Sequence, residues 1–551
     1  MDRIIRTCSL ALLISAAAVP VAAQASADFE GMRAYVQGRA ALSDDRLEDA
    51  VGHFRKALQQ QPANADLARR TFGIAIAAGD EEVAVSLVNR MDKKSAEAVE
   101  RRLFLLGEAV RNQDWAAALR ELQGIRTSSG LAFIAPMVEA WISLGSGTGD
   151  PIALLDGGEA NLLTTAYARE HRALLLGAMG RTQEALEAYQ PLLATTGGRS
   201  VRLKLAAAEM LLRADRRDDA LGVLEGDDPV LRKGRALIEA GQPLGTGVAT
   251  AQQGLAELYV RLAADLGRER VEALGLAAAR VSTFLAPGNA EGWLVTADLL
   301  AVQGSLPPAL TALERIPDND PFAQTAFGGK VQLLLRMNRP EDAVLLAQKA
   351  VKGSTDAAMW MQLGDLLSQM ERYREAAAAF DRAIDLTPKA QIGWALYLQR
   401  GSAYERDGQW HKAEKDLRRA YTLAPDQAVV LNYLGYSLLD RGKKLDEAEM
   451  LISKASALQP DAGSITDSLG WVYYRRGDYA RAVSTLERAV ATEPAEPTIN
   501  EHLGDAYWQV GRRVDARFAW RAALVGAERD VEKRRLQAKL DWGLEQVTAK
   551  R

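Results

Sequence analysis

The C-terminal part of the chain places apolar residues at helical spacing, and this pattern returns with a regular period. Its four clearest copies align on Gly401, Gly435, Gly470 and Gly504. They read LQRGSAYERDGQWHKAEKDLRRAYTLAP, LGYSLLDRGKKLDEAEMLISKASALQP, LGWVYYRRGDYARAVSTLERAVATEP and LGDAYWQVGRRVDARFAWRAAL. A repeat of about 34 residues accommodates two antiparallel helices and a turn. Alternating β-branched runs are almost absent, so the pattern predicts an all-α chain.

Small residues follow each glycine at fixed distances. In the third copy they are Ala482 and Ala489, and Pro494 comes after them. A glycine and two alanines let paired helices approach closely, and a proline cannot continue the second helix. The spacing therefore predicts a sterically defined contact between the two helices of each pair.

The same spacing continues upstream. Gly364 precedes the four clear copies, and Gly38, Gly73 and Gly107 follow one another in the same phase. The middle of the chain keeps only the second half of the pattern, as at Ala185 and Tyr189 of GRTQEALEAY. We expect a superhelical solenoid of roughly a dozen helix pairs, in which stacked neighbours bury a continuous core.

The expected organisation has five parts, and Gly-rich stretches at 145–158 and 240–254 are expected to be loops or seams between sub-arrays. The parts are a secretory signal over 1–27, an N-terminal array over 28–144, degenerate repeats over 145–290, a C-terminal array over 291–527 and a capping helix over 528–551.

The segment 1–27 has the order of a secretory signal. Arg3 and Arg6 precede an apolar run, and a string of small residues offers cleavage after Ala25 or Ala27. The run is too short to span a membrane as a helix. The only cysteine, Cys8, lies before the run, so the cleaved chain has no thiol and no lipoprotein cysteine. We expect an exported, periplasmic chain with no transmembrane segment after cleavage.

Composition and net charge limit the kinds of partner that we expect the chain to bind. The chain has 551 residues, of which 48% are hydrophobic and 25% charged, a composition typical of folded globular proteins. Its formal net charge is −4, which is too balanced for a polyanion-binding surface. Nucleic acid is therefore not an expected partner.

Residue patterns that carry chemistry are missing from the sequence. The four histidines, His53, His171, His411 and His502, do not have the spacing of metal ligands. No phosphate-binding loop and no G-x-S-x-G nucleophile turn occurs, and the cleaved chain has no thiol nucleophile. We expect no catalytic residue, no metal and no cofactor.

The helix pairs, with glycine, alanine and proline at these positions, resemble the tetratricopeptide-repeat (TPR) family. In that family the first helix of each pair lines a concave face, so the resemblance implies a protein-binding groove at fixed distances from the glycines. The candidate groove residues are Asn432, Tyr436, Asp467, Trp471, Tyr474, Glu501, Asp505 and Trp508, with Leu439 and Arg475 beside them. Aromatic and acidic side chains together suit a polypeptide with apolar and basic side chains. The alternative is that the aromatics pack between repeats.

Residues 431–524 resemble a narrower group, on the segments NYLGYSLLDR, ITDSLGWVYYRRGDYARAVSTLERAV and INEHLGDAYWQVGRRVDARFAWRAAL. These are the exported TPR proteins of Gram-negative bacteria that include the lipoprotein adaptor of a periplasmic carboxyl-terminal processing protease. The resemblance implies a solenoid that binds the protease and presents cell-wall hydrolases to it. The acylated cysteine of that adaptor has no counterpart at the cleavage site of this sequence.

Three functions remain open from the sequence. The favoured one is an exported, non-enzymatic protein-binding scaffold or adaptor of the bacterial cell envelope, with a carboxyl-terminal processing protease or a cell-wall hydrolase as partner. The second is a TPR scaffold of outer-membrane or polysaccharide export machinery. The third, of another class, is an envelope enzyme with an unrecognised site.

Overall fold

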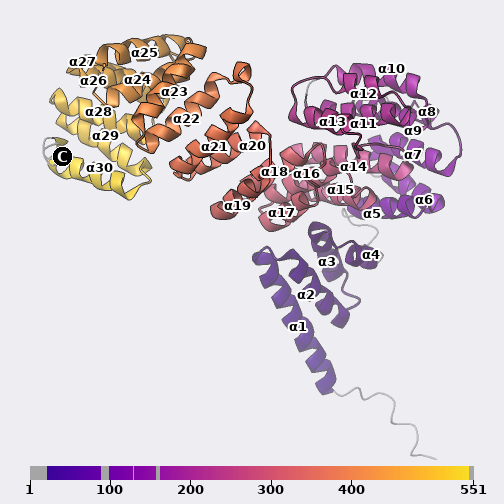
Figure 1. Ribbon diagram of the computed structural model, residues 1–551. Helices are drawn as coiled ribbons and strands as arrows, with labels where there is room; N and C mark the ends of the chain where they lie inside the picture. Colours follow the sequence, from indigo (N-terminus) through magenta and orange to yellow (C-terminus); the bar gives the residue numbers. More distant parts are fainter. Residues whose placement is uncertain are drawn as a thin grey trace, which may run out of the picture. The chain divides into compact units, whose positions relative to one another are not determined.

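The computed structural model describes residues 21–88, 98–127, 130–156, 162–195, 197–442 and 444–544. Within these residues the regular structure is helical and no strand is present, which confirms the predicted all-α class. The chain divides into two compact units, unit 1 over residues 1–339 and unit 2 over 340–551 (Figure 1). The sequence placed the start of its C-terminal array earlier, at residue 291.

Unit 1 consists of helices joined mostly by short turns, with a longer helix-free stretch at 241–250. Its helices are α1 (Val21–Ser43), α2 (Leu47–Gln60), α3 (Ala65–Ala78), α4 (Glu81–Val88), α5 (Ala98–Arg111), α6 (Trp115–Arg126), α7 (Ala135–Ser146), α8 (Pro151–Leu154), α9 (Leu162–Ala178), α10 (Thr182–Leu193), α11 (Gly198–Arg213), α12 (Arg217–Val223), α13 (Pro229–Glu239), α14 (Ala251–Arg268), α15 (Glu272–Leu285), α16 (Ala290–Val302), α17 (Leu306–Glu314) and α18 (Ala323–Arg336). Most of the expected signal, residues 1–20, lies outside the described residues. The expected cleavage sites after Ala25 and Ala27 fall within α1.

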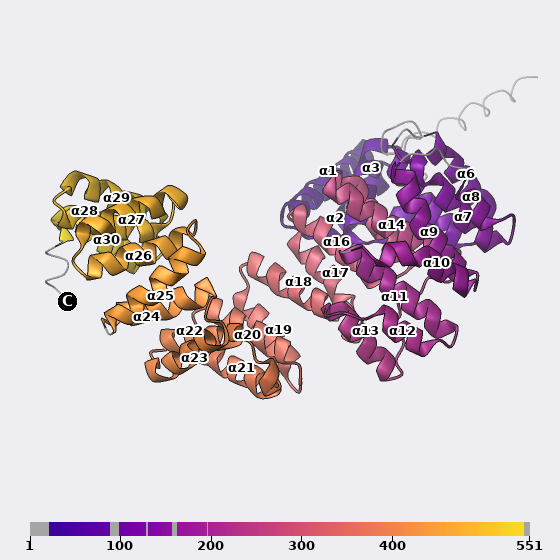
Figure 2. The same ribbon diagram turned by 90° about the horizontal axis from the view of Figure 1, so that it is seen from above.

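Helices α3, α5, α7 and α9 are the first helices of the earlier pairs of unit 1, and the pair α14–α15 packs on the side that they form. Helix α15 packs against α3 and α5, and α14 packs against α5, α7 and α9. Figure 2 shows α14 beside α7 and α9. The hydroxyl of Tyr259 on α14 donates to the carbonyl of Leu103 on α5 at 3.1 Å. Phe284 of α15 meets Phe104 of α5 edge to face, at 6.3 Å between ring centroids. This side of unit 1 is thus covered by the chain itself.

Two glycines allow this close packing. A Cβ atom at Gly107 would lie 2.6 Å from Cγ1 of Val281 on α15, and one at Gly254 of α14 would lie 2.2 Å from the ring of Trp141. Both distances are far below van der Waals contact, so a larger residue would push the helices apart. Gly107 follows the phase of the sequence repeat, yet the residue it accommodates belongs to a distant helix.

Unit 2 is a more regular series of antiparallel pairs (Figure 1). Its helices are α19 (Pro340–Val351), α20 (Ala357–Gln369), α21 (Tyr373–Leu386), α22 (Trp394–Arg406), α23 (Trp410–Leu423), α24 (Ala428–Asp440), α25 (Leu445–Leu458), α26 (Gly463–Arg475), α27 (Tyr479–Thr492), α28 (Pro497–Gln509), α29 (Arg513–Gly526) and α30 (Asp530–Trp542). Helices α20, α22, α24, α26 and α28 are the first helices of their pairs. Helix α30 packs on α29 and has no second helix after it among the described residues.

The repeated glycines of unit 2 set the distance within each pair, as their spacing predicted. A Cβ atom at Gly470 would lie 2.6 Å from Leu486, and one at Gly504 would lie 2.4 Å from Trp520. Ala482 and Ala489 on α27 are fully buried. The turns that follow α26 and α28 contain Gly477 and Gly511 with φ of 79° and 82°, a left-handed conformation that favours glycine. None of the described helices is long and apolar enough to cross a membrane.

Candidate functional site

The eight candidate groove residues lie on three successive first helices of unit 2. Asn432 and Tyr436 are on α24, and the other six are on α26 and α28. Helix α24 packs against α26, and α26 packs against α28, so the eight residues lie on neighbouring helices. We call the surface formed by α24, α26 and α28 the first-helix face of unit 2.

The centre of the first-helix face is an aromatic stack. The ring of Trp471 lies parallel to that of Tyr474, with centroids 4.4 Å apart, and the imidazole of His502 stacks on it at 4.0 Å. Tyr474 meets Tyr479 edge to face at 5.4 Å. Trp471, Tyr474 and Tyr436 are half-buried, so part of each ring faces solvent. Burial raises the pKa of both Tyr436 and Tyr474 to about 12, so both hydroxyls are neutral.

Asp467 does not face solvent. It is 5% exposed, and its carboxylate accepts a hydrogen bond from Nδ1 of His502 at 2.9 Å. Burial alone would lower the pKa of His502, but the charge and hydrogen bond of Asp467 outweigh burial and raise it. The pair therefore joins α26 to α28, and the acid that the sequence assigned to a groove is engaged within the protein.

Glu501 and Asp505 are covered by the C-terminal helix α30. Arg535 donates two hydrogen bonds to Glu501, at 2.9 and 2.6 Å, and Nζ of Lys539 lies 2.6 Å from Glu501 and 2.7 Å from Asp505. Lys539 is 5% exposed. Burial would raise the pKa of Glu501, but Lys539 and Arg535 hold it below its ordinary value. The two carboxylates are thus paired with cations of α30.

Trp508 is a packing residue in this structure. It is 7% exposed and lies 5.2 Å from Trp520 of α29, ring centroid to ring centroid. A Cβ atom at Gly543 would lie 2.2 Å from the Trp508 ring, so the residue after α30 closes over it. Helix α30 takes the position that the first helix of a next pair would take. Glu501, Asp505 and Trp508 therefore contact α30 and the residue that follows it.

Asn432 and Leu439 complete the placement of the candidates. Asn432 is half-buried, and its Oδ1 atom has no hydrogen-bond partner among the described residues. Leu439 is fully buried, whereas Arg475 is exposed at the end of α26. Of the eight candidate groove residues, the partly accessible ones are therefore Asn432, Tyr436, Trp471 and Tyr474.

Sequence reasoning missed the basic partners of these acids. The chain separations are 35 residues for Asp467 and His502, 34 for Glu501 and Arg535, and 34 for Asp505 and Lys539. Each basic residue thus lies one repeat after its acid. That offset was present in the sequence and is the signal that could have identified the pairs.

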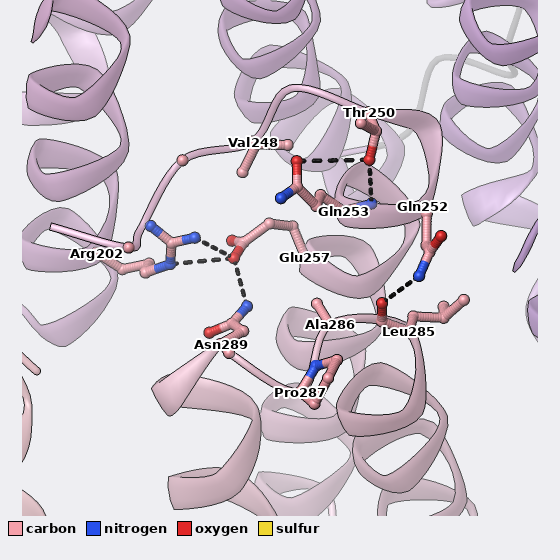
Figure 3. Close-up of a pocket in the computed structure, with 13 residues that line it drawn as sticks. Arg202, Val248, Thr250, Gln252, Gln253, Glu257, Leu285, Ala286, Pro287 and Asn289 are labelled. Carbon is pink, nitrogen blue, oxygen red and sulfur yellow. Dashed lines mark hydrogen bonds and ion pairs between the residues drawn. The ribbon is translucent and has the colours of Figure 1, made fainter. Parts of the chain in front are cut away.

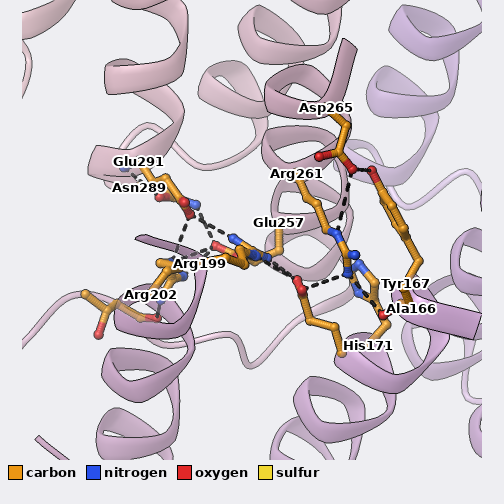
Figure 4. A network of polar contacts seen from close by, with 12 residues as sticks. Ala166, Tyr167, His171, Arg199, Arg202, Glu257, Arg261, Asp265, Asn289 and Glu291 are labelled. Atoms are coloured by element: carbon orange, nitrogen blue, oxygen red, sulfur yellow. Dashed lines mark hydrogen bonds and ion pairs between the residues drawn. The ribbon is translucent and has the colours of Figure 1, made fainter. Parts of the chain in front are cut away.

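Unit 1 contains a buried network of charged side chains that joins four helices (Figure 4). Arg199 on α11 contacts Glu170 on α9, Glu257 on α14 and Glu291 on α16. Arg202, also on α11, donates to Glu257 at 3.0 Å and to the carbonyl of Thr246 at 2.8 Å. Every arginine here has a carboxylate partner, so the network fixes these helices to one another.

Two further groups extend the network. Glu170 accepts a hydrogen bond from Arg261 at 2.8 Å. Burial would raise the pKa of Glu170, but Arg199 and Arg261 outweigh it and hold the pKa at about 2. The neighbouring His171 is fully buried, and burial lowers its pKa to about 4. Its Nδ1 accepts a hydrogen bond from Trp141 at 3.0 Å, which fits a neutral imidazole.

A cavity of about 290 Å³ lies beside this network (Figure 3). Its two charged wall residues, Arg202 and Glu257, are paired with each other, and Asn289 donates to Glu257 at 2.8 Å. Gln252 donates to the carbonyl of Leu285 at 2.6 Å. The two charged side chains of the cavity wall thus pair with each other inside the protein. In the part of the chain that the structure describes, no cluster of three or more His, Cys, Asp or Glu could hold a metal ion.

Comparison with known proteins identifies the repeats. Residues 261–529 match the family model described as tetratricopeptide repeat. The TPR repeat-containing protein PA4667 of Pseudomonas aeruginosa is 32% identical over 196 residues, which are 34% of this chain and 32% of that protein. Lipopolysaccharide assembly protein B of Escherichia coli K12 is 28% identical over 177 residues, 30% of this chain and 45% of that protein. The matches thus cover about a third and less than half of these two relatives.

Among solved structures, a tetratricopeptide repeat protein from Parabacteroides merdae is 16% identical, with a TM-score of 0.39, and the match covers 46% of this chain and 99% of that one. The family match, the sequence period and the paired helices agree with one another. Residues 261–529 of this chain are thus similar to the tetratricopeptide-repeat family.

Proposed function

We propose that the chain is a non-enzymatic protein-binding scaffold of the bacterial cell envelope, and that it holds a partner polypeptide on the first-helix face of unit 2. The observation that carries the proposal is the half-buried aromatic group of Tyr436, Trp471 and Tyr474 on that face. Rigid, partly buried aromatic rings are common anchors of protein interfaces.

The two units differ in what covers their first helices. In unit 1, α14 and α15 pack against the first helices α5, α7 and α9, which leaves this side no room for a partner. In unit 2, no described helix of that unit packs over the rings of Tyr436 and Trp471 in this way. The partner is therefore proposed for unit 2.

The paired acids change the expected chemistry of the partner. Asp467, Glu501 and Asp505 are buried and paired with His502, Arg535 and Lys539, so they do not present free negative charge. The candidate residues that remain partly accessible are then three aromatic residues and Asn432. We propose that the partner contributes apolar side chains to this face, with basic side chains as a minor element.

The envelope location rests on the signal-like segment 1–27. Arg3, Arg6, the apolar run after them and the small residues before Ala27 have the order of a secretory signal. The proposed compartment is the periplasm. The favoured partners are a carboxyl-terminal processing protease or a cell-wall hydrolase, because residues 431–524 resemble the exported adaptors of such a protease.

The comparisons support a second candidate. The similarity to Lipopolysaccharide assembly protein B, over 177 residues, favours a scaffold in the assembly of outer-membrane components. Its partners would be proteins of that machinery in place of a protease.

Affinity capture separates the two candidates. The full chain, tagged at its C-terminus, is expressed in its own cells, and the proteins retained from envelope extracts are identified by mass spectrometry. A protease or wall hydrolase that is retained by the wild type and lost with Trp471→Ala supports the favoured candidate. Retention of outer-membrane assembly proteins alone supports the second. If Trp471→Ala retains the same proteins in the same amounts as the wild type, the first-helix face is not the binding surface.

A further inference from the structure

A cleft of about 620 Å³ in unit 1 contains a buried arginine without a counter-ion among the described residues. The cleft lies between the turns that precede α2 and α4 and the helices α15, α16 and α17. Arg280 of α15 is 5% exposed and lines the cleft. One Nη atom donates to the carbonyl of Ala77 at 2.6 Å, but Nε has no hydrogen-bond partner in the part of the chain that is described.

The arginines of the charged network in unit 1, in contrast, have carboxylate partners. Arg202 is 3% exposed and is paired with Glu257, which accepts two hydrogen bonds from it. Arg280 forms no ion pair with any residue that the structure describes. A buried charge without a partner is costly, and a buried donor without an acceptor adds to that cost. Burial and the nearby Arg315 lower the pKa of Arg280 to about 10, which reflects the same lack of a counter-ion.

The guanidinium group of Arg315 and an apolar wall also line the cleft. Arg315, at the end of α17, is exposed and lines the cleft with Trp293, Pro307 and Pro308. A Cβ atom at Gly79 would lie 2.9 Å from an Nη atom of Arg280. The glycine therefore leaves the space that the Arg280 head group occupies.

Four carboxylates also line the cleft, but none pairs with either arginine among the described residues. Asp49 is paired with Arg46 at 2.7 Å, and Asp80 accepts a hydrogen bond from the backbone N–H of Val83 at 3.0 Å. Asp45 lies in the turn before α2, and Glu48 lies in the first turn of that helix. Three guanidinium groups line the cleft. Arg46 is paired with Asp49, whereas Arg280 and Arg315 have no carboxylate partner in the described part of the protein.

We propose that the cleft around Arg280 and Arg315 binds an oxyanion, a carboxylate or phosphate group of a ligand whose apolar part contacts Trp293 and Pro308. Planar guanidinium groups match the paired oxygens of carboxylates and phosphates and bind them with short, charge-assisted hydrogen bonds. Both arginines line the cleft, and neither has a carboxylate partner among the described residues. This site belongs to unit 1 and is independent of the proposed function of unit 2.

Isothermal titration calorimetry of the full chain tests the proposal, with sodium acetate and inorganic phosphate as separate probes at constant ionic strength. Arg315→Gln is the main variant, because Arg315 is exposed and its replacement leaves the core intact. Arg280→Lys keeps the charge but removes the fork of donors. Arg232→Gln is the control, since Arg232 is an exposed arginine of α13 outside the cleft. Circular dichroism confirms that each variant is folded.

We expect saturable binding of at least one probe, with affinity about tenfold lower in Arg315→Gln, the value of one charge-assisted hydrogen bond. Arg280→Lys should also bind more weakly, and Arg232→Gln should bind like the wild type. The probe bound more tightly identifies the ligand group as carboxylate or phosphate. The proposal is overturned if neither probe binds saturably, or if Arg315→Gln binds as tightly as the wild type.

Discussion

Nδ1 of His502 lies 2.9 Å from the carboxylate of Asp467, which comes 35 residues earlier in the chain. The two residues occupy neighbouring first helices, α28 and α26, and both are buried. Trp471 stacks on the same imidazole at 4.0 Å. The pair thus joins two repeats and contacts Trp471, one of the aromatic residues that we propose as the binding surface.

This pair should make stability depend on pH. The folded-state pKa of His502 is raised, so its contribution is complete below the unfolded value of about 6.5 and is lost as pH rises through the folded value. The melting temperature of the wild type should therefore exceed that of His502→Gln most at acidic pH. Thermal unfolding of both proteins from about pH 5 to about pH 9 measures the difference. A difference that stays constant over this range contradicts the assignment, and Asp467→Asn serves as the control in which the pH dependence disappears.

The ammonium group of Lys539 should be essential for docking of α30. Lys539→Met leaves Glu501 and Asp505 buried with one cation fewer, which costs about 3–5 kcal/mol when one partner of a buried pair is removed. Lys533→Met on the exposed side of the same helix should cost less than about 0.5 kcal/mol. Denaturant unfolding and limited proteolysis at the C-terminus report the loss. Equal effects of the two substitutions would show that the buried pairs do not hold α30.

Two glycines of the same sequence phase should respond in opposite directions to alanine. Gly107→Ala places a Cβ atom 2.6 Å from Val281, and such overpacking costs about 1–3 kcal/mol. At Gly73 an alanine methyl group would have no atom within 4 Å, so Gly73→Ala should stabilise its helix by about 0.5–1 kcal/mol. Thermal unfolding compares the two variants. If Gly107→Ala is neutral, α15 does not pack against α5 as the structure has it.

Substitution of two tryptophans of unit 2 should distinguish a residue that stabilises the fold from one that binds a partner. Trp508 is 7% exposed and packs on Trp520, so Trp508→Ala should destabilise unit 2 by about 3–5 kcal/mol. Trp471 is half-buried, and Trp471→Ala should reduce partner capture with a smaller loss of stability. Unfolding and capture measured on both variants give the comparison. A larger stability loss for Trp471 than for Trp508 would assign Trp471 to packing.

The sequence predicted the repeat architecture because the repeat is local. Gly470 meets Leu486 in the second helix of its own pair, and the all-α class follows from periodicity within each helix. The packing of α14 and α15 on the first helices of unit 1 could not be read from that period. Gly107 has the same phase and spacing whether the residue against it belongs to its own pair or, like Val281, to a helix far along the chain.

The candidate surface was predictable in position but not in accessibility. All eight candidates lie on the first helices α24, α26 and α28, as their distance from the glycines indicated. Whether a candidate side chain is accessible to a partner depends on which residues pack over it. Trp508 and Glu501 are covered because Arg535 and Lys539 of α30 pair with carboxylates of α28. The sequence of a polar terminal helix does not by itself show which of its sides packs on the repeats.

Site-specific photo-crosslinking in the cell tests the central claim most directly. A photoreactive phenylalanine analogue replaces Trp471 on the first-helix face in one protein and Ser484, which is exposed on the second helix α27, in another. Crosslinked products are identified by mass spectrometry. The account predicts a discrete product with another envelope protein from position 471 and none from position 484. A partner crosslinked from position 484 and absent from position 471 would contradict the assignment of the first-helix face as the binding surface.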